Sequence, residues 1–390
     1  MHAQTLLPSV VADLGGPIWL IAQLPNLALL GLKLTALLTV HHIGHLDRFK
    51  PILLRVNLLQ RLPYLLAALA LLLVPGMPWL CLIAVVMAPL MSGVFGGIGM
   101  TAWQQLVGIT VPPAGRISLF AFRQILGASM GLAAGWVVML VLTHQPGTTG
   151  FAILHLGAFG LMMVSYGLFS IIHEPAHDRL PEERSSLAAS LRSMLDILRQ
   201  DSRLRSYVLT NSLFGVSGML IPFLAMHALQ VTGLTSSFLG SLLMWQMGGV
   251  MVGSGIAVWL GKAWGGVSVL LAARIIFLGL AGLVLWASTP WQWCLIFGLL
   301  GAATNANFAG SNAMQLELLP YRKRAHFLAL IGASQIPVII TAGLVAYLTR
   351  ATWGDAGTEI LAIGSCLLVI ASLMPLASLL NRPSPTLEAS

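Results

Sequence analysis

Long apolar segments recur along almost the entire chain, and they limit what it can fold into. Most are close to the roughly 20 residues that an α-helix needs to cross a hydrocarbon layer of ~30 Å. Lipid offers no hydrogen-bond partners, so the backbone of such a segment must pair with itself, which favours a helix. We therefore predict an all-α polytopic membrane protein. The predicted full spans are residues 18–43, 53–74, 79–107, 119–143, 150–172, 206–229, 235–260, 267–288, 291–318, 325–349 and 358–380.

A shorter apolar piece, Thr5 to Leu14, precedes these spans and amounts to about half of one. It runs into the loop signal Asp13-Leu14-Gly15-Gly16-Pro17. We interpret this piece as a truncated first helix. The expected total is then about 12 transmembrane helices.

The composition excludes a water-soluble globule. Charged residues make up 8% of the 390 residues and hydrophobic residues 57%, whereas a soluble domain carries about 25% charged residues. The net charge of +8 does not indicate nucleic-acid binding, because the basic residues lie mostly in short loops, as in membrane proteins. The three cysteines, Cys81, Cys294 and Cys366, all lie in apolar segments, so we expect neither a disulfide nor a cysteine metal site.

One long polar run, residues 173–205, divides the apolar segments into two blocks of similar length. We interpret it as a cytoplasmic linker between an N-terminal bundle, residues 1–172, and a C-terminal bundle, residues 206–382, which is followed by a cytoplasmic tail at 383–390. With this linker in the cytoplasm, nearly all basic loop residues fall on the cytoplasmic side, as the positive-inside rule requires. We expect a multi-pass protein of the cytoplasmic (inner) membrane with a cytoplasmic C-terminus.

The two blocks share a succession of residues. The fourth span is followed by Pro-Pro-Ala-Gly-Arg at 112–116 and by Gly-Ala-Ser at 127–129. The tenth span is followed by Leu-Pro-Tyr-Arg-Lys-Arg at 319–324 and by Gly-Ala-Ser at 332–334. Matching basic loops in two blocks of six spans imply a parallel internal repeat, in which two bundles are related by pseudo-two-fold symmetry.

With this layout, the chain resembles the major facilitator superfamily over nearly its whole length. In that family the short loop after the second span carries the pattern Gly-x-Leu-x-Asp-Arg-x-Gly-Arg-Arg. Here the loop reads Gly44-His45-Leu46-Asp47-Arg48-Phe49-Lys50-Pro51. The Gly-to-Asp spacing is one residue shorter, and the second glycine is absent. The resemblance implies that Gly44, Asp47, Arg48 and Lys50 belong to a loop that takes part in conformational change.

The resemblance implies a secondary active transporter rather than an enzyme. Such a protein moves a small solute by alternating access, in which two bundles rock about a site near mid-membrane. The family also implies a monomer in the lipid bilayer, with no cofactor and no nucleic-acid partner. Whether H+ or another coupling ion takes part is open, and the substrate is unknown from the sequence.

The first helix departs from the family. Family members begin with a cytoplasmic tail and a full first helix, whereas this chain begins part-way along that helix. A start codon assigned too late and a shortened first helix are both open explanations. The short helix also keeps a second hypothesis open, namely a truncated relative that does not transport.

Lys33 lies inside the second span, roughly ten residues or ~15 Å from its cytoplasmic end. A charge at that depth costs ~2.5–3.5 kcal/mol on insertion scales, so it normally faces a water-filled cavity or a partner. Two interpretations stay open: Lys33 contacts the substrate, or it snorkels or stays neutral among its neighbours. No Asp or Glu lies at mid-depth in a full span. A cation without such a partner favours an anionic or neutral, partly apolar solute.

Polar residues concentrate on the tenth span, which lines the central cavity in this family, as do the first, fourth and seventh. Asn305, Asn312 and Gln315 have spacings that would place them on one helix face. A polar face there suits a substrate path, although interhelical hydrogen bonds, worth ~0.6 kcal/mol each, are an equal alternative. The substrate-path candidates are Lys33, Asn26, Gln104, Asn211, Asn305, Asn312 and Gln315.

Four other charged residues lie near the cytoplasmic ends of their spans. Arg61, Arg123 and Arg274 lie one to three turns inside, where we expect the side chains to snorkel to the interface. Glu317 closes the tenth span just before the basic run 322–324. We expect it to form an ion pair at the interface rather than to carry protons.

Three glycines of the fifth span, Gly127, Gly131 and Gly135, recur every four residues. This spacing places them on one helix face, where small residues let two helices approach closely. We expect this face to pack against another helix. The span lacks the proline of the family's antiporter motif, so a drug/proton antiporter is not predicted.

The sequence His173-Glu174-Pro175-Ala176-His177 matches the zinc-protease pattern His-Glu-x-x-His. It suggests an intramembrane metalloenzyme as an alternative function. Pro175 stands inside the motif, however, where proline breaks or starts a helix, and the motif lies at a loop. We therefore expect no metal site.

The predicted orientation can be tested by labelling the linker. Ser185 is replaced by cysteine in a background in which Cys81, Cys294 and Cys366 are alanine. We expect a membrane-impermeant maleimide to label this cysteine only from the cytoplasmic side, because the positive-inside rule places the linker there. Labelling from outside intact cells would contradict the topology.

Overall fold

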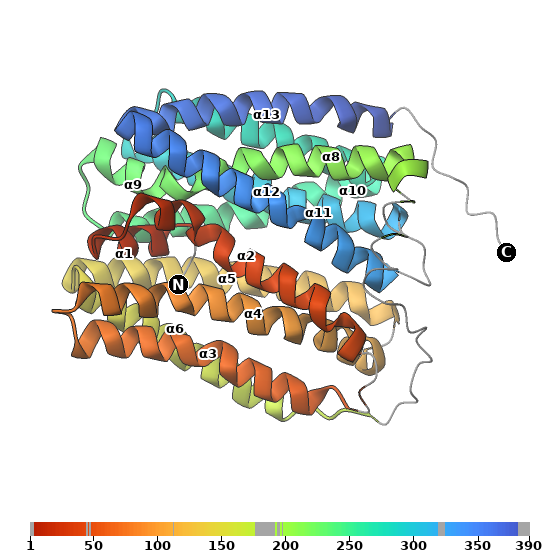
Figure 1. Cartoon of the computed structure of the whole chain (residues 1–390), viewed down its shortest axis with the longest axis horizontal. Helices are drawn as coiled ribbons and strands as arrows, with labels where there is room; N and C mark the ends of the chain where they lie inside the picture. The colour runs from red at the N-terminus through yellow and green to blue at the C-terminus, as the bar shows by residue number, and fades with distance from the viewer. Residues whose placement is uncertain are drawn as a thin grey trace.

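The computed structural model describes residues 4–43, 46, 48–111, 113–175, 192, 196, 198–318 and 324–380. Within them all elements of regular structure are helices (Figure 1). The first block forms α1 (Leu6–Asp13), α2 (Ile18–Ile43), α3 (Lys50–Leu73), α4 (Pro78–Thr110), α5 (Pro113–His144) and α6 (Thr148–Ser170). The second forms α8 (Ser202–Ser217), η1 (Gly218–Leu220), α9 (Ile221–Thr232), α10 (Phe238–Val284), α11 (Pro290–Leu318), α12 (Arg324–Trp353), η3 (Gly354–Ala356) and α13 (Gly357–Leu380).

Eight helical stretches within the described residues are long and apolar enough to cross a membrane. One of them is α10, whose 47 residues far exceed the roughly 20 of a single span. Gly265, with φ 76° and ψ −177°, divides α10 into two arms, because glycine reaches a positive φ at little cost. The predicted all-α polytopic fold is thereby confirmed, and the count of about 12 spans stays a prediction.

The helices of the two blocks gather in two halves. Figure 1 shows α2 to α6 together in the lower half and α8 to α13 in the upper half. The halves meet mainly where α2 packs on α12 and where α5 packs on α10. The arrangement follows the predicted bundles, whose bounds and two-fold relation stay predictions.

The short first helix is deeply buried. α1 has eight residues, and its Leu6, Leu7, Val10 and Val11 are at most 1% exposed. It contacts α9 of the second half as well as α2. A helix of this length is marginal by itself, so burial between the halves stabilises it. The half-length helix predicted from Thr5 to Leu14 is confirmed.

Glycines let the two halves approach closely at α5 and α10. A side chain at Gly131 would meet Met247, and one at Gly135 would meet the backbone of Gly240. The predicted packing face is thus confirmed for these two glycines. A Cβ atom at Gly127 would meet nothing within 4 Å, so this third glycine takes no part in the contact.

Two neighbouring glycines of α10 test this kind of packing within the second half. A Cβ atom at Gly249 would overlap the backbone carbonyl of Gly298 on α11, whereas one at Gly248 would meet nothing within 4 Å. We expect Gly249→Ala to destabilise the protein by ~1–3 kcal/mol, because overpacking forces the backbones apart. Gly248→Ala should leave stability unchanged or raise it by up to ~1 kcal/mol through helix propensity. Thermal unfolding of the purified variants in detergent measures both effects, and equal midpoints would contradict the close α10–α11 contact.

Candidate functional site

A cavity of about 670 Å3 lies between the two halves. From the first half it is lined mainly by α2, with Met100 of α4 and Gln4 just before α1. From the second half it is lined by α8, α11 and α12, with Phe277 of α10 and the junction of η1 and α9. Its wall therefore combines residues that are far apart in the sequence and belong to helices of both halves.

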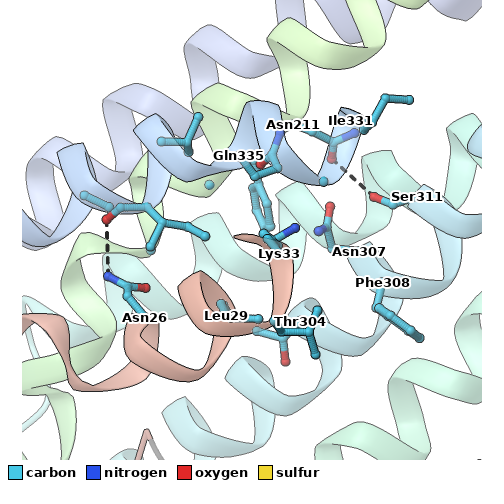
Figure 2. A pocket seen from close by; sticks show the side chains of 18 of the residues that line it. Asn26, Leu29, Lys33, Asn211, Thr304, Asn307, Phe308, Ser311, Ile331 and Gln335 are labelled. Atoms are coloured by element: carbon cyan, nitrogen blue, oxygen red, sulfur yellow. Dashed lines mark hydrogen bonds between the residues drawn. The ribbon is translucent and has the colours of Figure 1, made fainter. Parts of the chain in front are cut away.

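Lys33 projects from α2 into this cavity (Figure 2). In the figure its ammonium group points toward Asn307 of α11. Within the described part of the chain, Lys33 takes part in no hydrogen bond or ion pair. A charge at this depth normally faces a water-filled cavity or a partner, and the substrate contact of Lys33 stays a prediction.

Arg274 of α10 lies behind the cavity wall and is 0% exposed. Its Nη1 donates to Oδ1 of Asn307 at 2.6 Å, and its Nη2 donates to Oδ1 of Asn211 at 3.2 Å. The guanidinium carbon lies 4.4 Å from the ring centroid of Phe214, a cation–π contact. The snorkelling predicted for Arg274 is therefore wrong, because neutral partners on α8 and α11 hold the charge inside the bundle.

Solved structures share this arrangement of helices. The chain matches a crystal structure of a point mutant of the nucleoside transporter NupG with a TM-score of 0.69 and 15% identity, covering 96% of this chain and 94% of that one. It matches the D-xylose-proton symporter with a TM-score of 0.71 and 13% identity, covering 96% and 93%. It matches a bacterial homologue of the iron transporter ferroportin in an inward-facing state with a TM-score of 0.66 and 13% identity, covering 98% and 96%.

The chain has the major facilitator fold. At 13–15% identity the likeness concerns the fold and nothing finer. No protein-family model matches the chain, and the curated proteins give no match either. The function of this chain is therefore inferred from the residues that line its own cavity.

The cavity brings together most of the residues that the sequence analysis proposed for a substrate path. These are Asn26, Lys33, Asn211, Asn312 and Gln315. Gln104 lies in α4, but its side chain is outside the described part of the chain. The family resemblance implied lining by the first and fourth helices, whereas here α2 supplies most of the lining from the first half.

Asn305 does not line the cavity, contrary to the predicted polar face. Its Nδ2 donates to Oγ of Ser254 at 2.8 Å, and its Oδ1 accepts from Nε2 of Gln124 at 2.6 Å. The cavity-facing stripe of α11 runs through Thr304 and Ser311, and Asn305 lies about 100° around the helix from Thr304. Asn305 thus faces α10 and α5, and the interpretation as an interhelical hydrogen bond applies to it.

Sequence reasoning missed several polar residues of the wall. Asn307 and Ser311 of α11 and Gln335 of α12 line the cavity, and Figure 2 shows them around Lys33. A heptad spacing from Thr304 through Ser311, with Gln315 four residues further on, is the signal that could have found this stripe. For Gln335 no such pattern exists, because only the packing of α12 on α2 brings it near.

The other charged residues near the span ends differ in exposure and in their partners. Arg61 is 9% exposed, and its Nε donates to the carbonyl of Met162 at 2.8 Å, so the predicted snorkelling is wrong for it. Arg123 is exposed, with its guanidinium carbon 4.8 Å from the ring centroid of Trp103. The ion pair predicted for Glu317 is present, with Arg203 of α8 at 3.0 Å, and Arg322 and Lys323 of the basic run lie outside the described residues.

The predicted conformational loop is only partly described. Gly44 and Asp47 lie outside the described residues, Arg48 is exposed, and Lys50 begins α3. The carboxylate of Glu174 accepts hydrogen bonds from the backbone N–H groups of Phe49, at 2.7 Å, and of Lys50, at 3.0 Å. An anion at a helix N-terminus is stabilised by the free N–H groups and by the helix dipole, so Glu174 caps α3.

This cap gives Glu174 a structural role in place of the one suggested by the zinc-protease pattern. His177, the second histidine of that pattern, lies outside the described residues. Across the ranges that the structure does describe, no three or more His, Cys, Asp or Glu side chains gather in a way that could hold a metal ion. Nothing in the described part of the chain favours the metalloenzyme alternative.

The two cations of this region should respond differently to removal of their charge. Arg274→Met leaves Oδ1 of Asn307 without its donor, whereas Oδ1 of Asn211 keeps the bond from Ser311, so we expect a loss of ~1–3 kcal/mol of stability for the acceptor left unpaired. Lys33→Met removes a charge that has no described partner, so stability should stay the same or rise. Thermal unfolding in detergent compares the two variants directly. A larger loss for Lys33→Met would contradict the assigned environments.

Proposed function

We propose that this protein is a secondary active transporter that moves a small solute across a membrane by alternating access. The observation that carries this proposal is the cavity lined by helices of both halves. A site between two bundles can be exposed to either side when the bundles rock against each other. Two of the structural neighbours are described as a nucleoside transporter and a D-xylose-proton symporter, which supports transport rather than catalysis.

The contacts between the halves suggest which side is closed. Nδ2 of Asn26 on α2 donates to the carbonyl of Ile339 on α12 at 3.3 Å. Oγ1 of Thr5 donates to Oε1 of Gln246 on α10 at 2.9 Å. Thr5 stands just before α1, and Asn26 lies in the part of α2 nearer α1, whereas Lys33 lies further along α2, so both bonds lie toward the end of the molecule that holds α1 (Figure 1). We infer that the cavity opens at the opposite end, which the predicted orientation makes the cytoplasmic side.

These contacts are of a kind that a rocking motion can break. Each is a bond between neutral groups, with a net value of only ~0.5–1.5 kcal/mol. Of the ion pairs in the described part, Arg203–Glu317 and Arg350–Asp355 lie within the second half, and Arg199–Asp196 joins two residues just before α8, so none of them joins the halves. The halves are therefore joined by apolar packing and neutral bonds, which keeps two conformations close in free energy.

The location, orientation and oligomeric state of the protein are proposed from the sequence. The protein would act as a monomer in the cytoplasmic (inner) membrane with its C-terminus in the cytoplasm. A coupling ion, H+ or another, would use a group other than a cavity carboxylate, because the described lining contains no Asp or Glu. The non-transporting alternative predicts that the cavity never changes its accessibility.

Cross-linking the halves tests alternating access without knowledge of the solute. In a cysteine-free background, Asn312→Cys reports on the cavity, and Asn26→Cys with Ile339→Cys is bridged by a short bifunctional reagent. We expect an impermeant maleimide to reach Asn312→Cys from both sides before bridging and only from the cytoplasmic side afterwards, because the bridge holds the α1 end closed.

A matched control bridges two helices of the same half. Oγ of Ser378 on α13 donates to Oγ of Ser206 on α8 at 2.9 Å, so Ser206→Cys with Ser378→Cys should be bridged equally well. This bridge should leave labelling from both sides unchanged, because it does not join the halves. Labelling that is one-sided in the unbridged protein would contradict alternating access and favour a non-transporting protein.

A further inference from the structure

The charge balance of the cavity points to the class of solute. Lys33 is the single formally charged residue among the described residues that line the cavity. A cation at this depth is costly to hold without a partner, and the described part of the chain supplies none. A ligand that carried a negative charge would complete the pair, whereas a cationic ligand would be repelled.

A second cation, Arg274, lies behind the cavity wall. Arg274 is buried among neutral groups, and its Nε has no hydrogen-bond partner in the described structure. In a medium of low dielectric constant such a charge acts over several ångströms. No described carboxylate forms an ion pair with it. The field of Arg274 therefore adds to that of Lys33 in the part of the cavity that Asn211 and Asn307 line.

Arg274 also decides which way the amides of the wall point. An arginine side chain has only donors, so the amide atoms it contacts must be oxygens. Because Oδ1 of Asn307 accepts from Arg274, the Nδ2 group of Asn307 is left as a donor, and it has no described protein partner. Oδ1 of Asn211 is likewise occupied, by Arg274 at 3.2 Å and by Oγ of Ser311 at 3.3 Å. At these two asparagines the acceptor oxygens are therefore occupied, and Asn307 offers a donor to the cavity.

The remainder of the wall is mostly apolar. Leu29 of α2, Phe308 of α11 and Ile331 of α12 line the cavity around the polar cluster, and Figure 2 shows Leu29 and Phe308 on either side of Thr304. Apolar side chains with a few convergent polar groups are typical of sites for small organic molecules. One accessible cation and one amide donor match one carboxylate, with an apolar body against the other side chains.

We propose that this cavity binds a small organic monoanion, namely a monocarboxylate with an apolar body. Nζ of Lys33 and Nδ2 of Asn307 donate to the carboxylate, and Arg274 is a positioning residue that holds the Asn307 amide in the donor orientation. This inference rests on the proposed function, because it names the substrate class of the same cavity.

Three molecules of the same shape and different charge test the proposal: benzoate, neutral benzamide and cationic benzamidine. A second set, hexanoate, hexanamide and hexylamine, replaces the ring by a chain. Each is added to the purified full-length protein in detergent, and the midpoint of thermal unfolding is measured against concentration, because a ligand of the native state raises it. We expect the carboxylates to raise the midpoint and their amide and cationic counterparts to leave it unchanged.

Variants separate a specific site from unspecific effects on the detergent. Lys33→Gln should weaken carboxylate binding by about tenfold or more, because a charge-assisted hydrogen bond is lost, whereas Lys33→Arg should stay within a few-fold of the natural protein. Asn307→Asp places a carboxylate beside Arg274, and it should abolish the response to benzoate. Arg274→Lys keeps the charge and loses the fork that holds both amides, so it should weaken binding while Lys33 is intact.

The outcomes distinguish this inference from the proposed function. A response to benzamide or benzamidine equal to that to benzoate, an unchanged response in Lys33→Gln, or no response to any carboxylate would overturn the monoanion site. Each of these leaves alternating access to be decided by the cross-linking test. Carboxylate binding together with a cavity that labels from one side only would instead overturn transport and leave the anion site standing.

Discussion

A hydrocarbon layer supplies no hydrogen-bond partner, so every polar group carried into the membrane must find one within the protein. The backbone meets this requirement by forming helices, which make up all the described regular structure. Side chains meet it across helix pairs, as when Arg274 donates to Asn211 and Asn307. Lys33 has no such partner in the described structure and lies in the cavity. The need for hydrogen-bond partners therefore explains the helical fold and also singles out Lys33 as a candidate site residue.

Strong and weak contacts are distributed unevenly over the molecule. Arg203 of α8 pairs with Glu317 of α11 inside the second half, and Glu174 caps α3 inside the first. Hydrogen bonds that involve a charged group are roughly twice as strong as those between neutral groups. The bonds that join the halves are neutral, such as the one from Gln124 to Asn305. Charge-assisted bonds inside the halves and neutral bonds between them are compatible with the proposed rigid-body rocking.

Features that depend on short stretches of chain were predicted well. The half-length first helix and the division between the predicted spans 235–260 and 267–288 follow from local apolar length and loop chemistry, and the structure has both, the second as the break at Gly265. Glu317 was expected to form an ion pair and does so. The pairing with Arg203, 114 residues away in the sequence, could not be predicted, because a local pattern contains no information on such a distant neighbour.

The exposure of three arginines shows what the local sequence could not predict. Arg61, Arg123 and Arg274 all lie one to three turns inside their spans, yet Arg123 is exposed, Arg61 is 9% exposed and Arg274 is 0% exposed. Which way a residue points depends on how its helix is rotated about its axis. An amphipathic helix reveals that rotation through its apolar face, but a helix that is apolar all round does not.

By itself, the sequence determined that the chain is helical and crosses a membrane several times, because apolar length acts within each segment. It also singled out Lys33 as a charge at unusual depth. Only the tertiary structure decided that Asn307 and Ser311 share the cavity with Lys33 while Asn305 does not, and that Arg274 stands behind them. Those choices depend on how helices from the two halves are rotated and packed against each other, and packing of that kind involves residues far apart in the chain.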